Sequence, residues 1–153
     1  MTLTGICFLP NIKKEYELTK GTVRKVKEDK KTKKIPISAE DFLRKIGRMY
    51  SEYAVEDISC HMEPDFRNNS FWVLEEMTSA VQYVDYITGK IQTLKNENIV
   101  IKTSMMHIQQ WGEPCLVLEQ EPDIETCLFV ERSKNGLIAK MDMMPKGFYK
   151  LVP

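Results

Sequence analysis

The alternation of apolar and polar residues in the second half of the chain predicts four successive β-strands. The runs are rich in β-branched and aromatic residues, and residues typical of turns separate them. Short connections of this kind predict antiparallel pairing, and Asn135-Gly136 favours a tight hairpin. The predicted strands are Ile99–Ile108, Cys115–Gln120, Thr126–Arg132 and Leu137–Met144, and the breaks contain Gly112 and Pro114, Pro122 and Asp123, and Asn135-Gly136.

Two helices are predicted before these strands, and each is opened by a serine that can cap its first turn. Ser38 stands three residues before Asp41, and Ser79 stands three residues before Gln82, which is the capping-box spacing. Apolar residues then recur every three or four positions, so one face of each helix should pack on the core and Lys90 should be exposed. The two stripes are Phe42, Ile46, Met49, Tyr50 and Tyr53, and then Val81, Val84, Ile87, Ile91 and Leu94.

The chain between the two helices predicts a short hairpin. Ile58–Glu63 alternates apolar and polar residues and should end at Pro64, Asp65–Ser70 is polar and turn-like, and Phe71–Glu75 reads as the second strand. The same alternation places His61 on the polar side of the first strand, where it should face water.

Composition and charge favour a single domain with an extension. The 153 residues are 42% hydrophobic, and 22 basic residues balance 22 acidic ones, so net charge gives no reason to expect a nucleic-acid partner. Residues 13–34, however, hold ten Lys or Arg and four Asp or Glu. We therefore divide the chain into a basic N-terminal arm, 1–37, and a domain, 38–153. The arm is either a solvated extension or a contact for an acidic partner, and its apolar stretch Leu3–Leu9 is either a strand or a docking segment.

The cysteines and histidines give no sign of a metal or cofactor. Cys7, Cys60, Cys115 and Cys127 are far apart and form no CxxC pair, and the chain has only two histidines, so we expect neither metal nor cofactor. No segment approaches the roughly 20 apolar residues that span a bilayer. The expected protein is reduced, soluble and cytoplasmic, without membrane contact.

From Ser38 to Met144 the order helix, hairpin, helix and four strands resembles the NTF2-like superfamily, also called SnoaL-like or cystatin-like. Two local features add to the resemblance: Phe71-Trp72-Val73-Leu74-Glu75 before the capped helix, and Asn135-Gly136-Leu137-Ile138, which is similar to the Asp/Asn-Gly-x-Ile turn of many members. The resemblance implies an α+β cone, in which a curved, mostly antiparallel sheet carries helices on its concave face around a pocket. It also implies frequent homodimerisation through the outer sheet face.

Two catalytic candidates follow from this resemblance and from the strand pattern. Asp142 stands where several members carry an acid, and a carboxylate in a dry cone has a raised pKa and can move protons. Alternation places it beside Lys140, so an exposed ion pair is the alternative. His107 shares its strand face with Met105 and would point into the cavity if that face is concave, with a bond to a backbone carbonyl as the alternative.

The candidate ligand-binding residues are aromatic or sulfur-containing. The ketosteroid isomerase branch implies that a tyrosine hydroxyl, from Tyr50 or Tyr53, donates to a ligand carbonyl. Core packing explains the two tyrosines equally well, and core filling is the preferred alternative for the other candidates. The other candidate lining residues are Trp72, Met105, Trp111 and Met141.

Three functions stay open at this point. The first is binding of a small apolar or mixed ligand in the conical pocket, and the second is an isomerase or dehydratase-like enzyme with Asp142 or His107 as base. The third is a dimeric protein-interaction module. No nucleophile elbow and no phosphate-binding glycine loop is present in the sequence.

Overall fold

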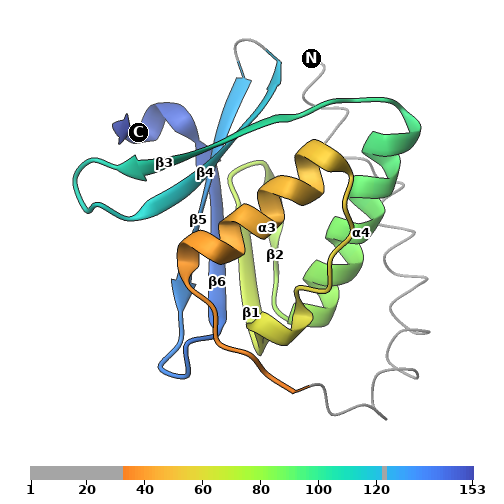
Figure 1. Ribbon diagram of the computed structural model, residues 1–153, viewed down its shortest axis with the longest axis vertical. Coiled ribbons are helices and arrows are strands. Elements are labelled where there is room, and N and C mark those ends of the chain that lie inside the picture. The colour runs from red at the N-terminus through yellow and green to blue at the C-terminus, as the bar shows by residue number, and fades with distance from the viewer. Residues whose placement is uncertain (1–32, 122–123) are drawn as a thin grey trace.

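The computed structural model describes residues 33–121 and 124–153. Most of the basic arm, including Leu3–Leu9 and Cys7, lies outside these residues, as does the Pro122-Asp123 turn. The described elements, with the labels of Figure 1, are α3 (Ala39–Glu52), the 3₁₀ turn η1 (Ser59–His61), β1 (Met62–Ser70), β2 (Val73–Met77), α4 (Ala80–Asn96), β3 (Lys102–Ile108), β4 (Pro114–Glu121), β5 (Ile124–Arg132), β6 (Ile138–Pro145), the 3₁₀ turn η2 (Lys146–Phe148) and β7 (Leu151–Val152).

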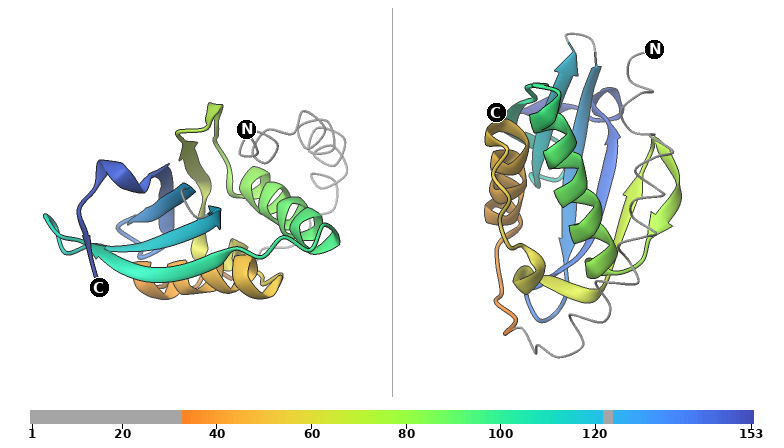
Figure 2. Two further views of the ribbon diagram at one scale, coloured as in Figure 1. Left: turned by 90° about the horizontal axis from the view of Figure 1, so that it is seen from above. Right: turned by 90° about the vertical axis from the view of Figure 1, so that its right-hand side faces the viewer.

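The seven strands form one sheet in the order β2-β1-β6-β5-β4-β3-β7. Neighbouring strands are antiparallel except β1 and β6, which run parallel. Both helices lie on one side of this sheet, and the segment after β6 returns along the other side (Figures 1 and 2). The predicted α+β class with a mostly antiparallel sheet is confirmed.

The main core lies between the two helices and the sheet. Its fully buried side chains come from α3, from α4 and from the helix-facing positions of β1, β4, β5 and β6. A smaller cluster occupies the opposite face of β3, β4 and β5, where Tyr149 and Leu151 of the final segment cover it. We call these two sides of the sheet the helix face and the outer face.

The predicted helix starts are confirmed by their hydrogen bonds. The Ser38 hydroxyl accepts a bond from the amide of Asp41 at 3.0 Å, and the Ser79 hydroxyl accepts one from the amide of Gln82 at 3.2 Å. These bonds satisfy amide groups that the first turn of a helix leaves unpaired. The hairpin before β6 lies at the predicted place, where the amide of Gly136 donates to the carbonyl of Ser133 at 3.0 Å and Gly136 has φ 76°.

The predicted strand Ile58–Glu63 is wrong. Ser59–His61 is a 3₁₀ turn, and β1 begins at Met62 and continues through Pro64 and the predicted turn 65–70. Proline is tolerated there because the pairing of β1 with β6 is interrupted between Met62 and Arg67, so no ladder bond requires an amide at Pro64.

Among the described residues, no helix is both long and apolar enough to cross a membrane. Cys60, Cys115 and Cys127 are free thiols. The cytoplasmic location stays a prediction.

Candidate functional site

A lysine is buried between the helices. Lys90 of α4 is only 4% exposed, so its predicted exposure is wrong. Its ammonium nitrogen lies 5.5 Å from the ring centroid of Tyr50 on α3 and 5.9 Å from that of Tyr86 on α4. These distances allow cation–π attraction, which offsets part of the cost of removing the ammonium from water. Lys90 stands three residues after the buried Ile87, a spacing that could have indicated an inward position.

A buried asparagine from β1 is the second polar group in the same interior. Asn68 is 5% exposed, and within the described residues its Oδ1 atom has no hydrogen-bond partner. It lies on the helix face because it alternates with Phe66, which belongs to the main core. Sequence reasoning missed Asn68 because the run 65–70 was interpreted as a turn, although the spacing of Phe66 and Asn68 carried a strand signal.

Two further tyrosines complete this group. The ring of Tyr83 packs 5.2 Å from Phe66 and 6.4 Å from Tyr86, measured between centroids. Burial raises the pKa of Tyr83 well above its ordinary value, and the neighbouring Tyr50 and Tyr86 add to the effect, so Tyr83 stays neutral at physiological pH. We call Tyr50, Asn68, Tyr83, Tyr86 and Lys90 the interior polar cluster. It offers an ammonium donor, phenol groups and an amide acceptor in an apolar surrounding.

The predicted ligand-binding residues on the helix face lie at different depths. Tyr50 and Met141 are buried in the main core. Tyr53 ends α3 in a left-handed conformation, and its hydroxyl donates to the carbonyl of Ile99 at 2.8 Å. Met105 lies in a groove of about 720 Å³ between α3 and β3, away from the interior polar cluster. Of these predicted ligand-binding residues, only Tyr50 therefore belongs to the interior polar cluster.

The two predicted catalytic residues are not brought together with Tyr50. Asp142 is paired in register with Phe129, whose side chain packs on the outer face, so Asp142 also lies there. Its carboxylate forms an ion pair with Lys140 at 3.2 Å, which is the alternative that the alternation left open. His107 is half-buried at the end of β3, opposite Val152 of β7. Catalytic roles for Asp142 and His107 stay predictions.

The two tryptophans lie near the outer face. Trp72 borders a recess of about 470 Å³ together with Tyr149 and the ion pair between Lys146 and Glu125, whose charged atoms are 2.8 Å apart. Trp111 is 57% exposed, and its ring meets that of Tyr149 edge-on at 6.2 Å. These two tryptophans therefore border the outer face rather than the space between helices and sheet, although Trp72 also touches the edge of the main core.

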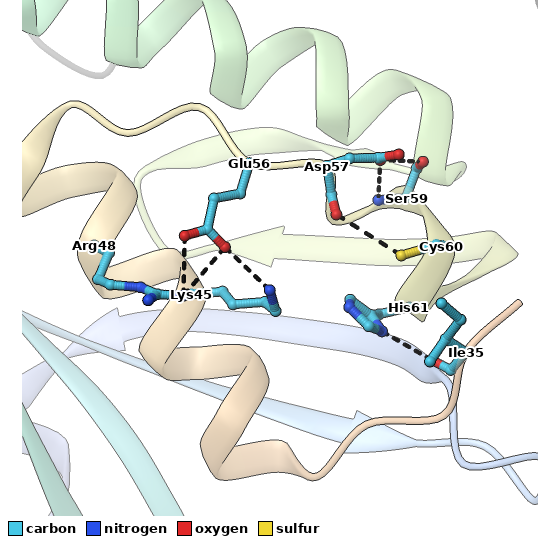
Figure 3. Close-up of polar contacts among 8 residues, drawn as sticks. All are labelled: Ile35, Lys45, Arg48, Glu56, Asp57, Ser59, Cys60 and His61. Carbon is cyan, nitrogen blue, oxygen red and sulfur yellow. Dashed lines mark hydrogen bonds and ion pairs between the residues drawn. The ribbon is translucent and has the colours of Figure 1, made fainter.

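The second histidine has a structural bond. His61 is 9% exposed, so its predicted exposure is wrong, and its Nδ1 atom lies 2.8 Å from the carbonyl oxygen of Ile35 (Figure 3). A neutral or charged ring that carries the Nδ1 proton donates to this carbonyl. The bond ties the segment before α3 to the 3₁₀ turn, and the amide of Ile35 strengthens the tie by donating to the carbonyl of Cys60.

A carboxylate links α3 to the same region. Glu56 accepts contacts from Lys45 at 3.1 Å and from Arg48 at 2.9 Å (Figure 3). Nearby, burial raises the pKa of the Cys60 thiol, and Asp57 adds to this effect, so the thiolate is disfavoured. No group of three or more metal-binding side chains occurs within residues 33–121 and 124–153. This polar network is best explained by structural anchoring.

Comparison with solved structures shows which fold this is. A SnoaL-like protein of unknown function from Burkholderia thailandensis matches with a TM-score of 0.54 and 10% sequence identity, over 74% of this chain and 100% of that one. A steroid delta-isomerase from Pseudomonas aeruginosa matches with a TM-score of 0.50 and 12% identity, over 73% of this chain and 83% of that one. No family model and no curated protein matches the sequence. At these identities the likeness concerns the fold alone.

Proposed function

Since this chain has the NTF2-like fold, we propose that it binds a small, partly apolar molecule at the interior polar cluster. The observation that carries the proposal is the burial of Lys90 and Asn68 inside a core that consists largely of apolar side chains. A protein that needed only stability would gain by placing apolar side chains at both positions, because burying an ammonium and an unsatisfied amide oxygen costs free energy. Polar groups retained at such a cost are candidates for ligand recognition.

The chemistry of the cluster indicates what the ligand carries. The Lys90 ammonium and the Tyr50 hydroxyl can donate hydrogen bonds to a carbonyl or carboxylate oxygen. The Oδ1 atom of Asn68 can accept a bond from a hydroxyl or N–H group. The surrounding rings, such as Phe66, provide contact for an apolar body. A ring compound with an oxygen acceptor at one place and a donor at another would complement the chemistry of these groups.

The likeness to a steroid delta-isomerase supports a ring compound as the ligand, but it does not support the same reaction. That protein's name states activity on a steroid, which is an apolar ring compound. An isomerase mechanism of the expected type needs a base beside the tyrosine donor. Asp142, one of the two expected bases, is on the other face of the sheet from Tyr50, and His107, the other, lies at the end of β3 opposite β7. We therefore propose binding without turnover.

Native mass spectrometry of freshly purified protein tests the proposal, followed by thermal shift with a panel of alicyclic ketones and carboxylic acids. We expect a bound small molecule or a panel compound that raises Tm. Lys90→Met should weaken binding of that compound at least tenfold, which corresponds to about 1.4 kcal/mol. The protein should stay folded, because methionine fills nearly the same volume without a charge.

Lys95→Met is the matched control, since Lys95 is exposed on the last turn of the same helix. It should leave binding unchanged. Equal effects of the two lysine variants, or binding that survives Lys90→Met and Asn68→Leu together, would refute the interior polar cluster as the site.

A second function is favoured by a separate observation. Three aromatic residues near the outer face are more than half exposed: Phe71, Trp111 and Phe148, with the rings of Phe71 and Phe148 in edge-on contact at 5.4 Å. Exposed aromatic residues that gather on one side are typical of interfaces. They support a homodimer formed through the outer face. In sedimentation velocity, Trp111→Lys should shift the protein toward the monomer. Val55→Lys, at an equally exposed apolar residue after α3, should not.

A further inference from the structure

One long edge of the sheet is unpaired in the described residues. Strand β3 pairs with β4 from Lys102 to His107, but on its other side β7 covers only His107 and Ile108. Residues 102–106 of β3 thus have no described strand beside them. An open edge is a template for another strand, and proteins usually cover or block it.

The pattern of hydrogen bonds identifies which backbone groups face outward. The amide of Ile108 donates to the carbonyl just before β4, and the amide of Gln109 donates to the carbonyl just before β7. In an antiparallel sheet successive residues bond to opposite neighbours. Counting back from Ile108 and Gln109, the amide and carbonyl groups of Thr103 and Met105 point away from β4, toward the unpaired side. An added strand would find four backbone groups there.

A groove runs along this same edge. It has a volume of about 720 Å³ and lies between α3 and β3. The helix approaches the sheet closely at Gly47, where an added Cβ atom would lie 3.1 Å from a methyl group of Leu116. The apolar part of the groove is formed by Ile37, Gly47, Met105 and Leu116, and charged or polar side chains of α3 border it. A strand on β3 would thus place every second side chain in the groove, which is the arrangement of β-strand addition.

The sequence contains a segment that suits this place. Residues 1–12 carry no charged side chain, and Leu3–Leu9 is an apolar run of strand type that ends at Pro10. An uncharged run of this kind promotes aggregation when it is left uncovered. The open edge of β3 also promotes aggregation. Pairing of the segment with this edge would remove both causes of aggregation.

The connection between them is long enough. The described chain starts at Lys33, and Ile37, only four residues later, lines the groove. Residues 10–32 can span roughly 75 Å when extended. As a flexible chain they would have an end-to-end distance of roughly 25 Å, whereas a domain of this size is roughly 35 Å across. A tether that is long enough to reach across the whole domain brings the segment to the groove at an effective concentration in the millimolar range.

We propose that the segment Leu3–Leu9 adds to the open edge of β3 within the same chain, bonding to the backbone of Thr103 and Met105 and filling the groove beside α3. This role for the arm is independent of the interior polar cluster, which lies on the other side of α3. It assigns to the arm the function of closing the sheet.

Residue-resolved hydrogen exchange by NMR tests this in the full chain. Neighbouring side chains of a strand point to opposite faces, so Ile6→Asp with Cys7→Asp puts a carboxylate into the groove in either register. We expect the amides of Thr103 and Met105 to exchange at least tenfold faster in this variant than in the unmodified protein. The amides of Ser104 and Met106, which point toward β4, should keep their rates.

The matched control places the same two carboxylates in the tether, as Gly21→Asp with Thr22→Asp, and should leave all four amides unchanged. The proposal would be overturned if the amides of Thr103 and Met105 exchange at the same rate in the unmodified protein and in the Ile6/Cys7 variant, whether that rate is fast or slow. Protection that disappears on dilution would also overturn it, because the segment would then come from a second copy of the chain.

Discussion

The ammonium nitrogen of Lys90 lies 5.5 Å from the centre of the Tyr50 ring, so α3 and α4 meet through a cation and an aromatic face in the middle of the core. A double-mutant cycle of Lys90→Met and Tyr50→Leu should measure this contact as a coupling free energy of about 0.5–2 kcal/mol in urea unfolding.

The control cycle pairs Tyr50→Leu with Lys95→Met, whose side chain lies outside the core. Those effects should add within about 0.5 kcal/mol. If the Lys90 cycle is equally additive, the ammonium and the ring do not interact in solution.

The titration of Tyr83 should make the protein less stable in alkali. The pKa of Tyr83 is raised in the folded protein, mainly by burial, whereas the unfolded chain releases this proton near pH 10. Above pH 10 the unfolded state therefore binds fewer protons, and this group lowers the free energy of unfolding by up to about 1.4 kcal/mol per pH unit. Tyr83→Phe should remove that slope, as urea unfolding between pH 8 and 11.5 can measure.

The control for this titration is Phe66→Leu, which alters the ring that packs on Tyr83 without removing a proton. It should lower stability by the same amount at pH 8 and pH 11. An unchanged alkaline slope in Tyr83→Phe would mean that Tyr83 ionises with its ordinary pKa in the folded protein.

Two helical glycines should respond oppositely to alanine. At Gly89 of α4 an added methyl group meets nothing within 4 Å, so Gly89→Ala should stabilise the protein by about 0.5–1 kcal/mol through helix propensity. At Gly47 of α3 the methyl group would lie 3.1 Å from the side chain of Leu116, so the same gain is offset by displaced core atoms. Thermal unfolding should show a higher Tm for Gly89→Ala only, and Gly47→Val should be clearly destabilised.

Local signals in the sequence were sufficient for the elements that local chemistry determines. Ser38 and Ser79 cap their helices because a short hydroxyl next to a free amide needs no tertiary partner. Gly136 adopts the positive φ that its turn requires. The alternation that grouped Asp142 with Lys140 is a property of any strand, and the ion pair between them follows from it.

The remaining features depend on partners that are distant in the sequence. β1 continues through Pro64 because its parallel neighbour β6, more than 70 residues away, does not need that amide. Lysine is a residue type that is usually exposed, and the rings of Tyr50 and Tyr86, which help to make its burial tolerable, come from other positions in the chain. The expected pocket residues were chosen by type and face, but the curvature and order of the strands distribute them over both faces.

Truncation should show that the domain begins at Lys34 rather than at the predicted Ser38. Residues 34–37 bond to the body of the protein: the Lys34 ammonium donates to the carbonyl of Ser59, Ile35 exchanges bonds with Cys60 and His61, and the amide of Ile37 donates to the carbonyl of Gly136.

Chains that start at residue 33 and at residue 38 should both be cooperative in urea unfolding. The shorter one should be less stable by roughly 2–3 kcal/mol, because its buried His61 ring and several carbonyls lose their partners. A third chain that starts at residue 38 and carries His61→Phe separates these contributions: it should recover part of the lost stability if the orphaned ring dominates. Equal stability of the two truncated chains would place the boundary at Ser38 after all and would reduce the contact between Ile35 and His61 in Figure 3 to a surface attachment.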